Sequence, residues 1–170
     1  MVFEGDLSKN KGSGTFKFNR NKNFVSFLEK ENIDTSDQIY YFKLFLGDVN
    51  ENYISDIKKM GYSPTIRELG RLVYHDASLN YIESMSLIYQ NLELDTISKF
   101  AAHNITSDYI TSFNTFNFDS LDPILIKKAK IHNITPEFIE RARIDNYNSN
   151  DFNDYIKFKI NKKLKTFRSK

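Results

Sequence analysis

The chain has 170 residues and a mass of 20.0 kDa, and its 24 Lys and Arg against 22 Asp and Glu leave a formal net charge of +2. Its 40% hydrophobic and 15% aromatic residues exclude a disordered polypeptide, and the lack of cysteine excludes disulfides and a cysteine nucleophile. No apolar run approaches the roughly 18 residues of a membrane-spanning helix, and no basic segment followed by an apolar one opens the chain. We therefore expect a single soluble domain, residues 1–170, that is cytoplasmic by default.

The first nineteen residues are typical of a β-hairpin. Two strands, residues 2–8 and 13–19, are predicted on either side of a turn at residues 9–12. The terminal unit of a helical array needs a cover for its outermost apolar face, so we expect residues 1–19 to cap the first helices. Four apolar side chains would face inward: Phe3, Leu7, Phe16 and Phe18.

An aromatic residue followed by an aliphatic one recurs along the rest of the chain. The aromatic members lie 29, 28, 28 and 29 residues apart: Phe24, Tyr53, Tyr81, Tyr109 and Phe138. A fixed period of this length is typical of repeat proteins, in which each unit buries its apolar face against its neighbours. We expect these five aromatics to be equivalent structural positions that stacking buries.

Each of the last four aromatics follows a helix-start signal. An N-capping residue stands three positions before it: Asn50, Ser78, Thr106 and Thr135. An Asp or Asn stands two positions before each cap: Asp48, Asp76, Asn104 and Asn133. A second break about nine residues after the aromatic divides the unit, and Gly61 is expected to end one such helix.

These signals predict a mainly α fold. Five units of about 28 residues, each with two short helices, would occupy residues 20–160 and stack as a small solenoid behind the N-terminal hairpin. The last ten residues, 161–170, would form a basic C-terminal tail that continues a helix in part.

Two segments resemble a known repeat family. Residues 130–139, Lys-Ile-His-Asn-Ile-Thr-Pro-Glu-Phe-Ile, are similar to a consensus His-Gly-Val-Thr-Pro-Glu-Tyr-Ile found in Bacteroidetes and related bacteria. Residues 12–19, Gly-Ser-Gly-Thr-Phe-Lys-Phe-Asn, are similar to the Gly-Ser-Gly-Thr-Phe-x-Phe hairpin that precedes those repeats. The family is often appended to BlaR-like antibiotic sensors and peptidases.

This chain departs from the consensus at its glycine, which is replaced by an Asp or Asn in each copy, at residues 48, 76, 104 and 133. Because Asp and Asn also tolerate a left-handed backbone, the resemblance implies that a left-handed turn ends the preceding helix in each copy. The resemblance implies a repeat that has no assigned chemistry of its own. The chain has neither a His-Glu-x-x-His motif nor a membrane span, so neither the peptidase nor the sensor role transfers to it.

The three histidines occupy one phase of the repeat, at the end of the second helix: His75, His103 and His132. Such a row could bind metal or sense pH, since imidazole titrates near neutrality. One shared zinc is disfavoured, because packed helices lie about 8–10 Å apart whereas zinc ligands converge on one point. We expect residues that interact with the helix dipole, and we predict no metal, no cofactor and no catalytic residue.

The C-terminal segment is strongly basic. Residues 157–170 hold seven basic and no acidic groups, which leaves 17 basic against 22 acidic groups elsewhere, a net of −5. The tail candidates for contact with an anionic membrane or with nucleic acid are Lys162, Lys163, Lys165 and Arg168. The acidic remainder argues against nucleic acid, and a solvated helix end paired with the acidic body is the plainer alternative.

Three functions therefore remain open. The leading hypothesis is a non-catalytic protein-interaction module, an adaptor or scaffold that holds an unidentified protein on a face built from repeated positions. The contrasting hypothesis is an accessory protein that uses its basic tail at a membrane surface or on nucleic acid. The third is an enzyme whose site is unrecognised, which we disfavour because no nucleophile elbow is present and we infer no small-molecule substrate.

Overall fold

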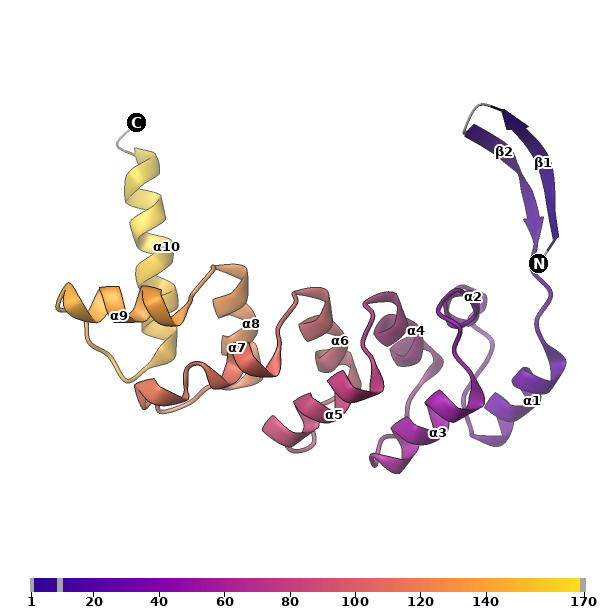
Figure 1. Ribbon diagram of the computed structural model, residues 1–170, viewed down its shortest axis with the longest axis horizontal. Coiled ribbons are helices and arrows are strands. Elements are labelled where there is room, and N and C mark those ends of the chain that lie inside the picture. The colour runs from indigo at the N-terminus through magenta and orange to yellow at the C-terminus, as the bar shows by residue number, and fades with distance from the viewer. Residues whose placement is uncertain (1, 9–10, 169–170) are drawn as a thin grey trace. The chain divides into compact units, whose positions relative to one another are not determined.

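The computed structural model describes residues 2–8 and 11–168 of the chain, and side chains for 13–15 and 17–161. It is mainly helical, as predicted (Figure 1). The chain divides into two compact units, Met1–Tyr74 and His75–Lys170. Within the described part, no helix combines the length and the apolar character needed to cross a bilayer.

The first unit opens with the predicted β-hairpin. Strands β1 (Val2–Ser8) and β2 (Lys11–Lys17) pair antiparallel. The second strand begins at Lys11 rather than at residue 13, because Lys11 and Gly12 extend the ladder opposite Ser8 and Leu7. The predicted turn thereby loses two of its residues to the strand, and the strand ends two residues earlier than expected.

Only part of the predicted hairpin cap falls on described side chains. Phe18, just past β2, lies against the second helix, with its ring centroid 5.1 Å from that of Phe42 and 5.0 Å from that of Phe45. The inward orientation expected of Phe3, Leu7 and Phe16 concerns side chains outside the described set. Lys9 and Asn10 of the expected turn also lie outside the described residues.

Between residues 18 and 74, all of which the structure describes, the first unit has four helices: α1 (Lys22–Lys30), α2 (Gln38–Leu46), α3 (Glu51–Lys59) and α4 (Ile66–Tyr74). Helices α2 and α4, far apart in sequence, pack side by side. Helix α4 starts at a capping box, in which Thr65 Oγ1 accepts from the Glu68 amide at 3.2 Å and Glu68 Oε2 accepts from the Thr65 amide at 2.9 Å.

As far as Arg168, where its described part ends, the second unit contains six α-helices and a short 3₁₀ turn: α5 (Leu79–Ile88), α6 (Leu94–Ala102), α7 (Ser107–Thr111), η1 (Asn114–Phe116), α8 (Pro123–Ile131), α9 (Pro136–Ile144) and α10 (Phe152–Arg168). Helix α10 packs against α8 and runs straight across the boundary predicted between residues 160 and 161. The backbone of the basic tail is therefore helical as far as Arg168.

Helix α7 is shorter than the sequence pattern predicts. Ser112 Oγ donates to the Tyr109 carbonyl at 2.8 Å, and Thr111 Oγ1 donates to the Ser107 carbonyl at 3.0 Å. Hydroxyl groups that bond to carbonyls in the preceding turn compete with the regular helical ladder. The chain then continues as η1, which ends at Asn117, a residue with a positive φ of 53°.

The predicted N-caps are confirmed. Each of these four side chains accepts a hydrogen bond from the amide of the aromatic residue three positions later, at 3.0 to 3.3 Å: Asn50, Ser78, Thr106 and Thr135. They satisfy amides that a first helical turn leaves without an intrahelical partner.

The predicted left-handed turns are also confirmed. Positive φ angles of 51° to 54° occur at Asp48, Asp76, Asn104 and Asn133. A further set ends the other helices, at Asn32, Gly61, Asn91, Asn117 and Asn146, of which sequence reasoning named only Gly61. Asn and Asp tolerate this backbone region better than other residues with a Cβ, and glycine tolerates it best. Helices of both sets therefore end in the same left-handed turn.

The core includes the aliphatic members of the last four recurring pairs, whereas Val25 of the first pair is only partly buried. Ile54, Ile82, Ile110 and Ile139 are at most 2% exposed. The aromatic members, expected to be buried by stacking, are only half-buried: Phe24, Tyr53, Tyr81, Tyr109 and Phe138. Their burial is therefore partial, because an aromatic ring at the rim of the core can bury its body while its edge stays accessible to solvent.

Candidate interaction surface

The recurring tyrosines connect successive segments of the second unit. Tyr81 Oη donates to the Ile105 carbonyl at 2.6 Å, and Tyr109 Oη donates to the Ile134 carbonyl at 2.9 Å. Both acceptors precede the N-cap of a later helix. Burial raises the pKa of both hydroxyls and raises the pKa of Tyr53 to about 12. The hydroxyls of Tyr81 and Tyr109 thus link each helix start to a later loop of the same unit.

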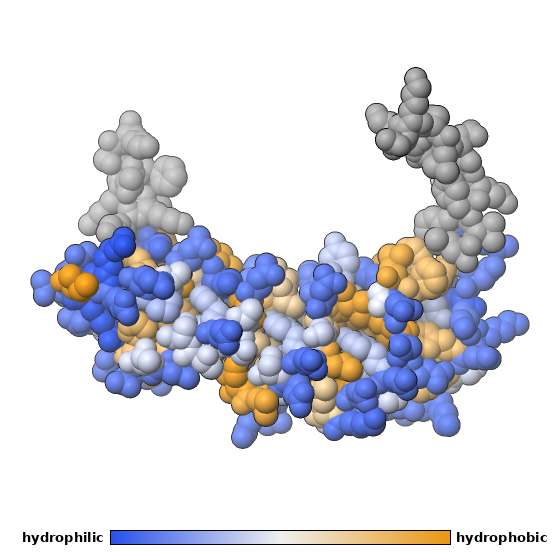
Figure 2. All heavy atoms as spheres, viewed as in Figure 1, coloured by the Kyte–Doolittle hydropathy of each residue, from blue (hydrophilic) through white to orange (hydrophobic). Residues whose placement is uncertain are grey.

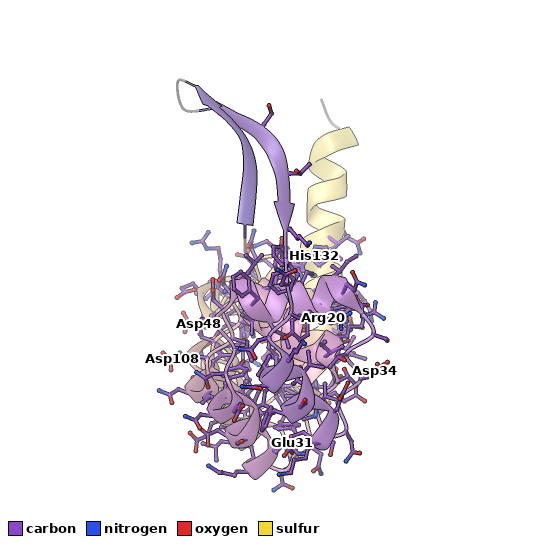
Figure 3. All side chains as sticks on the ribbon, turned by 90° about the vertical axis from the view of Figure 1, so that its right-hand side faces the viewer. Arg20, Glu31, Asp34, Asp48, Asp108 and His132 are labelled. Carbon is purple, nitrogen blue, oxygen red and sulfur yellow. The ribbon has the colours of Figure 1, made fainter. Side chains whose placement is uncertain are left out.

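The histidines lie where sequence reasoning placed them. His103 and His132, the latter labelled in Figure 3, are the C-caps of α6 and α8, and His75 directly follows α4. Helix C-termini favour groups that can carry positive charge. Among the described side chains, no group of three or more His, Cys, Asp or Glu is arranged to hold a metal ion.

The predicted tail contacts fall on side chains that the structure does not describe: Lys162, Lys163, Lys165 and Arg168. The earlier cations of α10 are held by their own unit. Lys157 Nζ lies 3.0 Å from Asp154 Oδ1, and Lys159 Nζ lies 4.1 Å from the centre of the Phe138 ring and donates to the Asn133 carbonyl at 3.2 Å. Lys159 thus links α10 to Phe138 on α9 and to Asn133 after α8, whereas the Lys157 pair lies within α10.

A different feature stands out in the first unit. Half of the exposed large apolar side chains found among the described residues lie on α2 and α4: Ile39 at 70%, Phe45 at 47%, Leu46 at 64% and Tyr74 at 68% exposure. Figure 2 shows apolar side chains gathered around α2. Sequence reasoning named no residues for an interaction face. The signal was present in α2, whose sequence Gln-Ile-Tyr-Tyr-Phe-Lys-Leu-Phe-Leu is apolar on every side of a helix.

We call this region the α2–α4 surface. Its members are Ile39, Tyr40, Lys43, Phe45 and Leu46 from α2, and Arg67 and Tyr74 from α4. Tyr41 and Leu44, on the opposite side of α2, are buried in the core. One side of α2 therefore anchors the helix while the other presents apolar side chains to solvent.

Two glycines set how closely the two helices approach. A Cβ on Gly47, at the end of α2, would lie 1.6 Å from Val73 Cγ1. A Cβ on Gly70, inside α4, would lie 2.8 Å from Tyr40 Cδ1. Because neither position has room for a side chain, the end of α2 and the ring of Tyr40 lie directly on α4.

The α2–α4 surface is also positively charged. Lys43 Nζ lies 4.8 Å from the centre of the Tyr40 ring and 4.7 Å from that of Tyr74, and Arg67 Cζ lies 5.8 Å from the Tyr40 ring. A hydrogen bond from Arg67 is the main reason why the pKa of Tyr40 is lowered, and Arg71 contributes to the same effect. The cations therefore surround the tyrosine hydroxyl as well as its ring.

Carboxylates are scarce around these cations. Within the described part of the chain, neither Lys43 nor Arg67 forms an ion pair. Helix α2 contains no acidic residue, and the one acidic residue of α4, Glu68, is bound to Thr65 at the start of the helix. The surface thus combines exposed apolar groups with uncompensated positive charge.

Shallow hollows lie elsewhere among the described residues, and one in each unit is lined by charged side chains. The first, of about 780 Å³, lies beside α1 and is lined by residues that include Arg20, Lys22 and Tyr41. Arg20 is committed within it, since its Nη1 donates to the Thr35 carbonyl at 2.7 Å and its guanidinium lies over the Tyr41 ring. The second, of about 660 Å³, includes Asp122, which caps α8. Arg20 and Asp122 are thus both engaged in contacts within the fold.

Comparison with known proteins yields no relative: no family model matches the chain, and no curated protein or solved structure matches it. The α2–α4 surface has the features of a site for noncovalent binding. It offers apolar area that a partner can bury and cations that can donate hydrogen bonds to anionic groups.

Proposed function

We propose that this chain is a non-catalytic protein-interaction module, an adaptor or scaffold whose helix pairs repeat and stack as a small α-solenoid. The observation that carries the proposal is the α2–α4 surface, where four large apolar side chains are 47% to 70% exposed on two adjacent helices. Exposed apolar side chains that cluster in this way mark contact sites with other molecules, whereas apolar side chains scattered singly over a surface do not.

Periodic local structure supports the repeat. The last residues of α2, α4, α6 and α8 lie 28, 28 and 29 residues apart: Leu46, Tyr74, Ala102 and Ile131. Three of these four are large, apolar and more than half exposed. Recurrence of an exposed apolar residue at one phase is what a binding face made from repeated positions requires. On this proposal the chain also belongs to the Bacteroidetes repeat family that its sequence resembles.

The test is affinity capture from a Bacteroidetes lysate, with mass spectrometry of the retained proteins. The bait is the full chain, compared with a Leu46→Asp variant and with Ile144→Asp as the matched control. Ile144 is 79% exposed on α9, in the other unit. We expect a specific protein that the parent chain and Ile144→Asp retain and that Leu46→Asp loses. Retention that is the same for all three baits would contradict an interaction through this surface.

A second function is favoured by the charge distribution of the second unit. Residues 127–170 hold 12 basic and 5 acidic groups, whereas residues 75–126 hold 1 and 7. A cationic helical end of this kind suits an anionic membrane surface. Cosedimentation with phosphatidylserine vesicles, compared between the full chain and residues 1–160, tests it: binding that disappears with the tail and with added salt supports the membrane role.

A further inference from the structure

The apolar part of the α2–α4 surface is a stripe along one helix. Ile39 and Leu46 are seven residues apart, which on an α-helix is two turns, or about 10 Å. Both are more than half exposed, and Phe45 adds a partly exposed ring beside Leu46. A partner can cover this stripe only with apolar side chains that are spaced two helical turns apart.

Lys43 lies midway along the stripe. Its ammonium group is bracketed by the Tyr40 and Tyr74 rings, at 4.8 and 4.7 Å from their centres, so its position is set before any partner arrives. Arg67 approaches the same Tyr40 ring from α4. Arginine presents a planar fork that matches a carboxylate, and a lysine held in place loses little freedom when it binds one.

These two properties restrict the chemistry of the occupant. A partner that covered Ile39 and Leu46 would also withdraw Lys43 and Arg67 from water. Removing a cation from water without a counter-charge is costly, whereas a carboxylate in hydrogen-bonding contact offsets the loss. An entirely apolar or basic partner would therefore be rejected.

We propose that the α2–α4 surface binds an acidic amphipathic segment of a partner protein. Its apolar side chains, two helical turns apart, cover Ile39, Phe45 and Leu46, and its Asp or Glu side chains bind Lys43 and Arg67. This inference rests on the proposed function and names the class of partner that the surface selects. An anionic membrane fits less well, because Lys43, Arg67 and the neighbouring Arg71 fall short of the clusters of about four to eight basic residues typical of lipid recognition.

The experiment is selection of random phage-displayed peptides on the full chain, followed by affinity measurements with the enriched peptides. We expect enriched peptides to combine Asp or Glu with apolar residues at helical spacing. Lys43→Glu and Arg67→Glu should each weaken their binding by about tenfold or more, because attraction becomes repulsion. Lys59→Glu is the matched control, since Lys59 is an exposed cation on α3 that pairs with Asp56, and it should leave binding unchanged. Circular dichroism verifies that each variant is folded, and the exposed position of Arg67 keeps the test valid if Lys43→Glu does not fold.

A charge swap sharpens the result. Peptides in which the carboxylates are replaced by lysine should recover binding to Lys43→Glu/Arg67→Glu. The inference would be overturned by enriched peptides that carry no charge, or whose binding is unchanged by both Lys43→Glu and Arg67→Glu. If Leu46→Asp nevertheless abolished the binding of those peptides, the proposed interaction module would remain intact. Failure to enrich any peptide, together with binding to phosphatidylserine vesicles that Arg67→Glu abolishes, would overturn the inference in favour of a membrane. Failure of both probes would also overturn it, and the lysate capture then decides the proposed function separately.

Discussion

The hydroxyl of Tyr81 donates a 2.6 Å hydrogen bond to the carbonyl oxygen of Ile105, 24 residues further along the chain. Tyr109 repeats this relationship with Ile134, 25 residues further on, at 2.9 Å. In both cases a half-buried ring near the start of one helix fixes the loop that leads to another, and the acceptor is itself buried in the core. The hydroxyl of each tyrosine therefore stabilises the spacing between consecutive segments of the second unit.

Replacing Tyr81 or Tyr109 by Phe should lower the free energy of unfolding. The loss should be about 1 kcal/mol for each variant, because the buried carbonyl loses its donor while the ring is kept. Urea unfolding monitored by circular dichroism measures it. Tyr40→Phe is the control and should cost less, since the Tyr40 hydroxyl interacts with Arg67 and Arg71 at the surface. Equal losses in all three variants would contradict a special role for the loop contacts.

Stability should decrease at alkaline pH. Burial raises the pKa of Tyr53 to about 12 and also raises the pKa of Tyr81, Tyr89 and Tyr109, whereas unfolded tyrosine has a pKa of about 10. The folded state therefore holds these protons more tightly than the unfolded state. The contribution of these hydroxyls to the free energy of unfolding is fully present below a pH of about 10 and is lost as the pH rises above that value.

Urea midpoints measured between neutral pH and pH of about 11 test this dependence. The decline above pH of about 10 should be smaller in Tyr81→Phe/Tyr109→Phe, because two of the groups that titrate differently are then absent. A midpoint that is constant over this range would show that these hydroxyls are as accessible in the folded as in the unfolded chain.

The left-handed turn at Asn104 should tolerate glycine but not alanine. Its φ is 51°, a region that costs a residue with a plain Cβ about 1–2 kcal/mol. We expect Asn104→Ala to lower the unfolding free energy by about that amount and Asn104→Gly to leave it nearly unchanged. Asn80→Ala, within α5, is the control and should be neutral or stabilising because alanine favours helix. Thermal melts of the three variants are sufficient, and a loss in Asn104→Gly as large as in Asn104→Ala would be inconsistent with a conformational cause.

The contact between Gly47 and Val73 should behave as a steric pair. Gly47 has a φ of −93°, which any residue can adopt, so the penalty for Gly47→Ala should come only from overlap with Val73. We expect a loss of about 1–3 kcal/mol. Val73→Ala should restore part of that loss in the double variant, and a double-mutant cycle by urea unfolding measures the coupling. Additive effects would show that α2 and α4 do not meet at this point.

The features that sequence reasoning predicted correctly are local ones. Thr106 caps α7 because its hydroxyl is three residues from the Tyr109 amide, and Asn104 turns the chain because its own side chain permits a positive φ. The hairpin followed from alternating residues and a short polar turn, although its second strand begins and ends two residues earlier than predicted. Interactions of this range are determined by neighbours in the chain, so their signals can be read directly.

The features that sequence reasoning did not predict depend on contacts between distant segments of the chain. The sequence determined where helices start and end, because caps and turns act within a few residues. Only the tertiary structure decided that Tyr41 and Leu44 face the core while Ile39 and Leu46 face solvent, since α2 is apolar on every side and its orientation depends on its contact with α4. The same holds for the half-burial of Tyr81 and its bond to Ile105. These features depend on which distant segments meet, and the close approach of α2 and α4 at Gly47 and Gly70 is what creates the candidate binding surface.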